Sequence, residues 1–359
     1  MKKLVVSSAL LAASGLAVAQ STVTLFGIVD ATLQRGSGST ASRTQLGSGG
    51  NSTSRLGFRG TEDLGGGMSA GFWLEAAVSA DNGQGGATNT NNQTTGTAVA
   101  PNGTQGLAFS RRSTVSLAGG WGELRLGRDY AVQYYNRFEF DPFGNNGVGS
   151  SQTNAGSLGG PVSSRVSNAV MYFLPADLGG FYGEAQYYLG ENASNAGATE
   201  EDGTGGGVRL GWRAGPANVA IAHARTQYAQ TATTGDITSS NIAARYDFGS
   251  FAVMGGYYRD TVDRIGKLTG RGPQLGAIFR VGAGEIKAQW SSYKTSASGS
   301  PESKKISLGY VHSLSKRTAV YGTYARVRNS GGATTALNGS ATAANQSSSG
   351  FDLGVRHSF

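Results

Sequence analysis

The chain lacks several features that mark common protein classes. It has no cysteine among its 359 residues, which excludes disulfide bonds and thiol chemistry. Proline is scarce, and the abundant glycine shows no G-x-y period, which excludes a collagen-like fold. Beyond the N-terminus, no run reaches the roughly 18 consecutive apolar residues that a membrane-spanning helix requires.

Histidine is also rare, and the three that occur form no catalytic pattern. His312 and His357 share strand parity with apolar neighbours, whereas the neighbours of His223 are too apolar to assign its face. None stands in a Ser–His or metal-ligand arrangement, and glycines 205–207 lack the strand-to-helix context of a phosphate cradle. The basic residues are dispersed, which argues against nucleic-acid binding. The sequence therefore predicts no enzyme activity, catalytic residue, cofactor, metal site or nucleic-acid partner.

Residues 1–19 have the three regions of a secretory signal peptide. Lys2 and Lys3 precede an apolar run that begins at Leu4, and AVA at 17–19 forms an A-x-A cleavage site. The segment is too short and too weakly flanked to be a spanning anchor. We predict cleavage after residue 19, which leaves 20–359 as the mature chain.

Apolar and polar residues alternate along most of this mature chain. In TVTLFGIVDATL (22–33), Leu25, Val29 and Leu33 fall on one face, and Asp30 and Thr32 fall on the other. The same pattern recurs in GELRLGR, GVRLGWR, NIAARYDF, EIKAQWSSY and GFDLGVRHSF. A period of two indicates strands and not helices. The strand near 318–328 has no assigned face.

The connections between these strands fall into a short set and a long set. Short turns include LGGG after Asp63, FGS at 248–250 and SLSKR at 313–317, and long polar loops lie at 81–106, 131–164, 190–204, 229–238, 295–303 and 329–349. An even number of alternating strands with loop lengths divided in this way is typical of an outer-membrane barrel, whose closure satisfies every backbone group in lipid. A secreted β-sandwich would not explain the one-sided loop lengths. We therefore predict an all-β fold: a 16-stranded antiparallel transmembrane β-barrel with short periplasmic turns and long extracellular loops.

Seven motifs, spread in order along the mature chain, carry a family resemblance. They are VTLFGIVDA, SRLGFRGTEDLGGGM (54–68), LRLGRDY, DPFG (141–144), SRVSNAVMY (164–172), LSKRTAVYGTYA (314–325) and GVRHSF. The set resembles the general porins of Gram-negative bacteria, of the betaproteobacterial and neisserial type. The resemblance implies a trimeric, water-filled outer-membrane channel for passive diffusion of ions and small hydrophilic solutes, with the third loop folded into the barrel. Met171, where a basic residue is expected, and the long Asn/Thr-rich second loop depart from the family pattern.

The third loop of the predicted barrel, 131–164, is too long for an ordinary strand connection. It holds a group of aromatic residues: Tyr134, Tyr135, Phe138, Phe140 and Phe143. Because exposed aromatics without a partner are costly, we expect the loop to fold inward as a constriction loop and to bury them against the wall. Glu139 and Asp141 are then expected near the aperture. The alternative is a surface loop packed against its neighbours.

Four arginines with lumen parity are the predicted selectivity residues: Arg55, Arg59, Arg112 and Arg165. Arg165 shares its parity with Ala169 and Met171. Arginine stays charged, and a ring of such charges favours anions. Facing Glu139 and Asp141, the ring would create a transverse field and a mild anion selectivity. For any single arginine, solvation of the wall is an equally good explanation.

The remaining expectations concern the solute and assembly. A substrate-specific outer-membrane channel is the alternative function, because four scattered tyrosines have lumen parity: Tyr182, Tyr188, Tyr258 and Tyr293. The final strand keeps an apolar parity up to Phe359 and is expected to pair with the first strand at 22–34, which leaves no edge. A terminal phenylalanine resembles the signal that the outer-membrane insertion machinery reads. The expected partners are two further copies in a homotrimer, outer-membrane lipid, and small hydrophilic solutes and anions.

Overall fold

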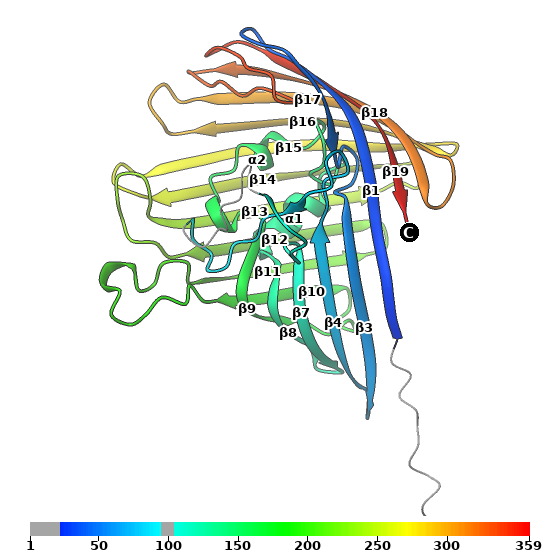
Figure 1. Ribbon diagram of the computed structural model, residues 1–359, viewed down its shortest axis with the longest axis vertical. Helices are drawn as coiled ribbons and strands as arrows, with labels where there is room; N and C mark the ends of the chain where they lie inside the picture. Colours follow the sequence, from blue (N-terminus) through cyan, green and yellow to red (C-terminus); the bar gives the residue numbers. More distant parts are fainter. Residues whose placement is uncertain (1–21, 95–103) are drawn as a thin grey trace, which may run out of the picture.

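Strands cover most of the chain, and their order around the sheet follows their order in the sequence (Figure 1). The computed structural model describes residues 22–94 and 104–359, so the predicted signal peptide lies outside the described residues. The strands of the main sheet are β1 (Thr22–Ser37), β2 (Arg43–Ser48), β3 (Arg55–Gly65), β4 (Met68–Ala77), β7 (Arg112–Gly119), β8 (Gly122–Tyr130), β9 (Arg165–Phe173), β10 (Phe181–Tyr188), β11 (Gly205–Ala214), β12 (Ala217–Thr226), β13 (Asp236–Asp247), β14 (Phe251–Asp263), β15 (Leu268–Val281), β16 (Gly284–Thr295), β17 (Glu302–Ser313), β18 (Thr318–Ser330) and β19 (Ser348–Ser358). The short β5 (Gly85–Gly86) and β6 (Thr104–Gln105) pair separately.

The sheet has sixteen strand positions, although it contains 17 strands. Both β2 and β3 pair with β1: β2 along 31–36, and β3 along 22–28. The two strands are therefore halves of one interrupted strand, and the interruption at 49–54 leaves the sheet. The predicted 16-stranded barrel is confirmed.

The barrel closes where the two ends of the chain meet. Strand β1 pairs with β19 from Ile28 opposite Ser358 to Ser37 opposite Ser349. The backbone of Phe359 continues this ladder, because it exchanges two hydrogen bonds of 3.0 Å with Gly27. The predicted pairing of the first and last strands is confirmed.

The two faces of the strands differ as the alternation predicts. On β12, Val219 and Ile221 are exposed on the outer face, whereas Ala220 and Ala222 are buried on the inner face. His223 belongs to the outer face, where its Nδ1 lies 2.8 Å from the Ser240 hydroxyl. On β18 and elsewhere the same division holds, so the apolar residues form an outward band.

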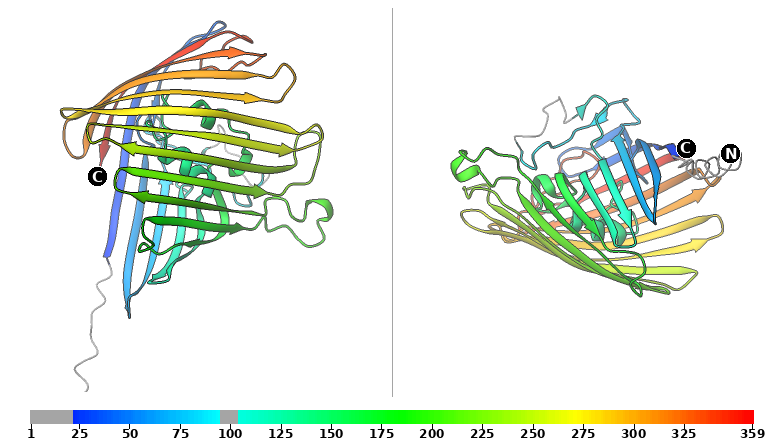
Figure 2. Two further views of the ribbon diagram at one scale, coloured as in Figure 1. Left: turned by 180° about the vertical axis from the view of Figure 1, so that it is seen from behind. Right: turned by 90° about the horizontal axis from the view of Figure 1, so that it is seen from below.

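Short turns join the strands at one end of the barrel, and at the other end most connections are long loops, with the short loop 264–267 between β14 and β15 as an exception. Figure 2 shows the loop that contains η3 (Gly197–Thr199) projecting beyond the sheet at the end opposite the C-terminus. Within 22–94 and 104–359, no helix has the length and apolar character needed to span a bilayer.

Segment 131–164 contains α1 (Val132–Glu139), α2 (Gln152–Ala155) and η2 (Gly160–Val162). Helix α1 contacts β10 to β13, and α2 contacts β15 to β17 (Figure 1). These contacts use inward side chains: Asn136 donates to Asn241 Oδ1 at 2.8 Å, and the Gln152 amide donates to Ser291 Oγ at 2.8 Å. The third loop therefore lies inside the barrel, as predicted.

Candidate functional site

Three arginines gather around one carboxylate on the inner wall. Glu75 on β4 forms an ion pair with Arg111, and its Oε1 lies 3.5 Å from Arg55 Nη1. Arg165 donates from Nε to the Arg111 carbonyl at 2.9 Å. We call Arg55, Arg111 and Arg165 the first arginine group. It brings three guanidinium charges to a single negative charge.

Aromatic rings of β8 and of segment 131–164, which we call the inner segment, adjoin this group. Tyr130 accepts a 3.0 Å hydrogen bond from Arg111 and lies beneath the Arg165 guanidinium, 4.5 Å from its carbon to the ring centroid. The Tyr130 ring stacks with Tyr134 at 5.2 Å between centroids. Phe138 stays 43% exposed, so the aromatic residues are only partly buried against the wall, whereas Phe140 is fully buried. A guanidinium held over a ring stays charged and keeps its N–H edge available.

Arg111 was missed by strand parity, which assigns it to the face of the exposed Val115. Strand β7 begins only at Arg112, so Arg111 belongs to the preceding loop and turns inward to Glu75. The adjacent arginines in SRRS are the one sequence signal that could have drawn attention to it. Arg112 itself lies elsewhere in the lumen.

Strand parity sets Arg165 on the same face as Ala169, but β9 contains a register shift between the two residues. Residue Asn168 has a left-handed backbone (φ 55°), and the pairing with β8 shifts between Gly127 and Asp129. As a result Val166, and not Arg165, joins Ala169 in a buried apolar cluster. Arg165 stands at the start of β9, before this irregularity, and its side chain contacts the first group from there.

A second arginine group consists of Arg59, Arg112 and Arg125. These residues line a cavity of about 400 Å³ together with Trp73 and Glu123. Arg125 donates to Glu123 at 2.9 Å and to Asp129 at 2.7 Å, and Arg112 lies 3.3 Å from Asp129. The four predicted arginines are therefore divided between two groups, and in the second group two carboxylates balance most of the charge.

The two predicted acidic residues have partners within the wall and the loop. Glu139 forms ion pairs with Arg209 and Arg213 and accepts a 2.8 Å hydrogen bond from Asn218. Asp141 accepts from the Phe143 and Ser151 amides at 2.7 and 2.9 Å and is 5% exposed.

Burial raises the pKa of Asp141, although the two amide hydrogen bonds oppose this change. Its carboxylate holds a turn of the inner segment. Glu139 and Asp141 thus have partners of their own in the wall and the loop, and the transverse field between them and the selectivity arginines stays a prediction.

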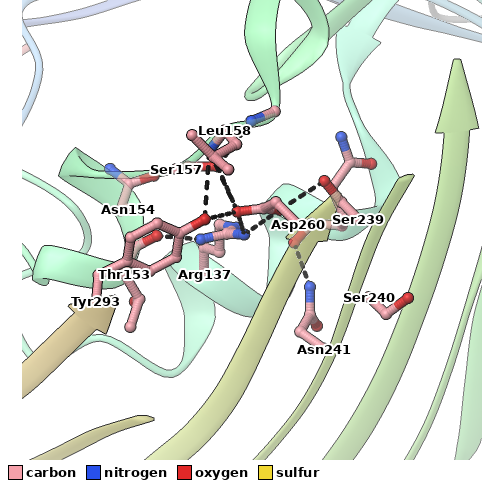
Figure 3. A network of polar contacts seen from close by, with 12 residues as sticks. Arg137, Thr153, Asn154, Ser157, Leu158, Ser239, Ser240, Asn241, Asp260 and Tyr293 are labelled. Carbon is pink, nitrogen blue, oxygen red and sulfur yellow. Dashed lines mark hydrogen bonds and ion pairs between the residues drawn. The ribbon is translucent and has the colours of Figure 1, made fainter. Parts of the chain in front are cut away.

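A buried ion pair fixes the inner segment to the wall (Figure 3). Arg137 on α1 donates to both carboxylate oxygens of Asp260 on β14 at 2.8 and 3.0 Å, and the two side chains are at most 1% exposed. Asp260 also accepts from Ser239 at 2.7 Å, Ser157 at 3.1 Å and Tyr293 at 2.5 Å. The sequence offers no signal for this network, because its members are up to 156 positions apart and have no common motif.

The tip of the inner segment crosses to the closure seam. The Val148 amide donates to Asp352 on β19 at 2.7 Å, and the Thr53 amide donates to Asn146 at 3.0 Å. Beside this tip lies a cavity of about 650 Å³, whose lining includes Arg280, Lys287, Glu285 and Arg356. The cavity is thus lined by more basic than acidic wall residues.

Three of the four lumen tyrosines are buried supports of the inner segment. Tyr258 donates to the Asn136 carbonyl at 3.3 Å, Tyr293 donates to Asp260, and Tyr188 packs in the apolar cluster with Val162. Only Tyr182 is partly exposed, and it lies under Arg209 at 5.0 Å. These side chains do not form a continuous aromatic track for a sugar.

Comparisons with known proteins agree with one another. The Gram-negative porin family profile matches residues 6–332. Outer membrane porin protein 32 of Delftia acidovorans is 36% identical over 374 residues, with all of both chains covered. An outer membrane porin protein of Bordetella pertussis is 29% identical, covering 91% of this chain and 94% of its own.

Solved structures show the same fold. The anion-selective porin from Comamonas acidovorans superposes with a TM-score of 0.82 at 34% identity, covering 95% of this chain and all of its own. An outer membrane protein of Vibrio cholerae, OmpT, superposes with a TM-score of 0.65 at 15% identity, covering 94% and 98%.

Proposed function

This chain belongs to the Gram-negative porin family, and from that premise we propose that its lumen passes small hydrophilic solutes by passive diffusion with a mild preference for anions. The protein is an outer-membrane β-barrel of Gram-negative type. The family and the relatives named above are channels and not enzymes. The preference of the channel for anions over cations depends on the charges of the wall.

The first arginine group carries the proposal. Three guanidiniums meet only Glu75 as a carboxylate partner among the described residues, so positive charge is in excess beside the aromatic face of the inner segment. A fixed positive excess in a narrow, partly desolvated passage attracts anions and repels cations. The anion-selective porin from Comamonas acidovorans, to which this chain is similar, supports the same sign.

Reversal potential in a planar bilayer tests the proposal. With a tenfold KCl gradient across the membrane, we expect a potential of the sign that chloride permeation produces. The potential should decrease when both salt concentrations are raised, because salt screens the wall charges. A potential of the cation sign would refute the proposed selectivity while leaving the channel itself intact.

We also propose that residues 1–19 are removed during export. N-terminal sequencing of the protein from outer membranes should begin at Gln20. A sequence that begins at Met1 would refute this proposal.

Phe359 is proposed as the signal for the insertion machinery. It ends the last strand, and its ring covers Gly27 on the outer face of β1. Deletion of Phe359 should lower the amount of barrel in outer membranes of cells and leave refolding in detergent intact. Normal surface levels of the deletion would contradict this role.

A homotrimer is the proposed assembly, because the apolar outward residues near the closure seam offer a packing surface, among them Leu33 and Leu353. A heat-sensitive trimer band after gentle extraction would support it. A monomer under the same conditions would refute it.

A further inference from the structure

The cavity beside the tip of the inner segment contains two cations that the chain leaves unpaired. Lys287 on β16 and Arg356 on β19 line this space of about 650 Å³, which we call the tip cavity. Among the described residues, neither charged group has a hydrogen bond or an ion pair, and Arg356 Nε is buried without a partner. The third basic residue of the lining differs, because Arg280 donates to the two carboxylate oxygens of Asp247 at 2.9 and 2.6 Å. Lys287 and Arg356 therefore remain available to an anion from the lumen.

The acidic residues of the lining have other neighbours. Both carboxylate oxygens of Asp141 accept backbone amides of the inner segment, at 2.7 and 2.9 Å. Glu285, the other acid that lines the tip cavity, lies opposite Arg280 in the ladder between β15 and β16. The lining acids therefore leave the two unpaired cations to a diffusing anion.

An aromatic ring of the inner segment lines the same cavity. Phe138 on α1 is 43% exposed there, although most aromatic residues of the segment are better covered. Tyr130 supports this ring, because the two rings stack at 6.3 Å between centroids with an angle of 19°. A solute ring that packs on Phe138 gains more than the burial of its area, since aromatic pairs favour stacked or edge-to-face arrangements.

Close packing holds the tip of the segment against the wall. A Cβ at Gly276 on β15 would lie 2.7 Å from Pro142 Cδ, and one at Gly309 on β17 would lie 2.9 Å from Phe143 Cε1. Glycine at these two wall positions therefore allows the tip to approach the strands closely. The ring and the two cations consequently belong to a cavity whose shape is set before any solute arrives, as is usual for small-molecule sites.

We propose that the tip cavity binds aromatic carboxylates, with the solute ring against Phe138 and the carboxylate held by Lys287 and Arg356. A carboxylate supplies the acceptors that the unpaired donors lack, and such charge-assisted hydrogen bonds are the strong ones. Chloride gains nothing from the ring, and an uncharged aromatic solute gains nothing from the cations. The first arginine group does not line this cavity, so the two places that attract anions are distinct. The inference rests on the proposed passage of anions and names the class of anion that the lumen retains longest.

Block of the chloride current through single channels in a planar bilayer tests the inference. The reversal potential of the full-length barrel in a KCl gradient is measured first, so that the sign of the proposed selectivity is known independently. The probes are then benzoate and cyclohexanecarboxylate, added separately at increasing concentration. They have the same charge and nearly the same size, but only benzoate has an aromatic ring.

Two variants separate the ring from the charges. F138L keeps an apolar side chain and removes the ring, and K287Q/R356Q removes the two cations. The matched control for the ring is F248L, because Phe248 is 55% exposed in a short turn. The matched control for the charges is K316Q/R317Q, which removes two exposed cations at the same end of the barrel. Folding of each variant is checked by heat-modifiable gel migration.

Half-block of the wild-type channel should require about fivefold less benzoate than cyclohexanecarboxylate. F138L should lose this difference, and K287Q/R356Q should weaken block by both anions about tenfold, whereas the two controls should behave like the wild type. Equal block of the wild type by the two anions would overturn the inference, and so would an F138L channel that keeps the preference for benzoate. A reversal potential of the cation sign would instead refute the proposed selectivity, whichever probe blocks better.

Discussion

Arginines serve two different purposes in two neighbouring regions of the lumen wall. Where the inner segment contacts β11 and β14, each arginine meets a carboxylate: Arg137 on α1 meets Asp260, and Arg209 and Arg213 on β11 share Glu139. On β3, on β9 and just before β7, three arginines share Glu75 as their one carboxylate partner among the described residues. The same residue type is structural where its charge is balanced, and it produces a field where its charge is in excess.

The largest expected effect comes from removing the carboxylate that balances the charge of a buried arginine. Asp260→Asn leaves the buried Arg137 guanidinium without a counter-charge, and such a loss costs about 3–5 kcal/mol. We expect the free energy of unfolding in urea, measured on the barrel in detergent, to fall by this amount. The double variant Arg137→Met/Asp260→Leu should recover most of the loss, because neither partner is then left charged. If the double variant were as unstable as Asp260→Asn, packing and not charge balance would hold the segment.

The next largest effect should come from deleting part of the inner segment, which contacts both groups of wall strands. Deletion of 138–148 removes the tip that contacts Asp352 and Thr53, so the lumen widens and single-channel conductance rises. The matched control is deletion of 192–199, which lies in an outer loop and should leave conductance unchanged. Equal conductance of both deletions would mean that the segment does not limit the passage.

A smaller effect is expected in the second arginine group, where Glu123 and Asp129 balance most of the positive charge. Arg59→Ala removes a guanidinium whose contacts within the described part of the chain are with the rings of Phe26 and Trp73, at 5.3 and 5.0 Å. The neighbouring Arg112 and Arg125 are already paired with acids, so the reversal potential should move only slightly toward cations. A shift as large as that of the complete first group would make Arg59 the main selectivity residue.

Strand parity predicted the barrel because a lipid-facing strand must alternate along its whole length. The same rule places Arg111 on the outer face, although it turns inward, because the residue precedes its strand. At Arg165 the rule gives the lumen side, but the pairing of β9 is irregular there, since a left-handed residue follows at 168. Charge excess therefore arises at the ends of strands, where a period of two no longer applies.

The partners of the inner segment could not be predicted from local patterns. Glu139 and Asp141 were recognised as acidic residues in the correct loop, but their hydrogen bonds depend on where the loop contacts the wall. Arg137 and Asp260 meet across 123 positions of sequence, and their pairing follows from tertiary contact alone.

The central claim is that uncompensated inward arginines set the selectivity, and reversal potential under a salt gradient tests it most directly. Arg55→Ala/Arg111→Ala/Arg165→Ala should move the potential from the anion sign toward the cation sign, more strongly at low salt. The control Arg225→Ala/Arg259→Ala/Arg271→Ala loses the same three charges from the outer face and should keep the wild-type potential. An unchanged potential in the first variant, or an equal shift in both, would contradict the account.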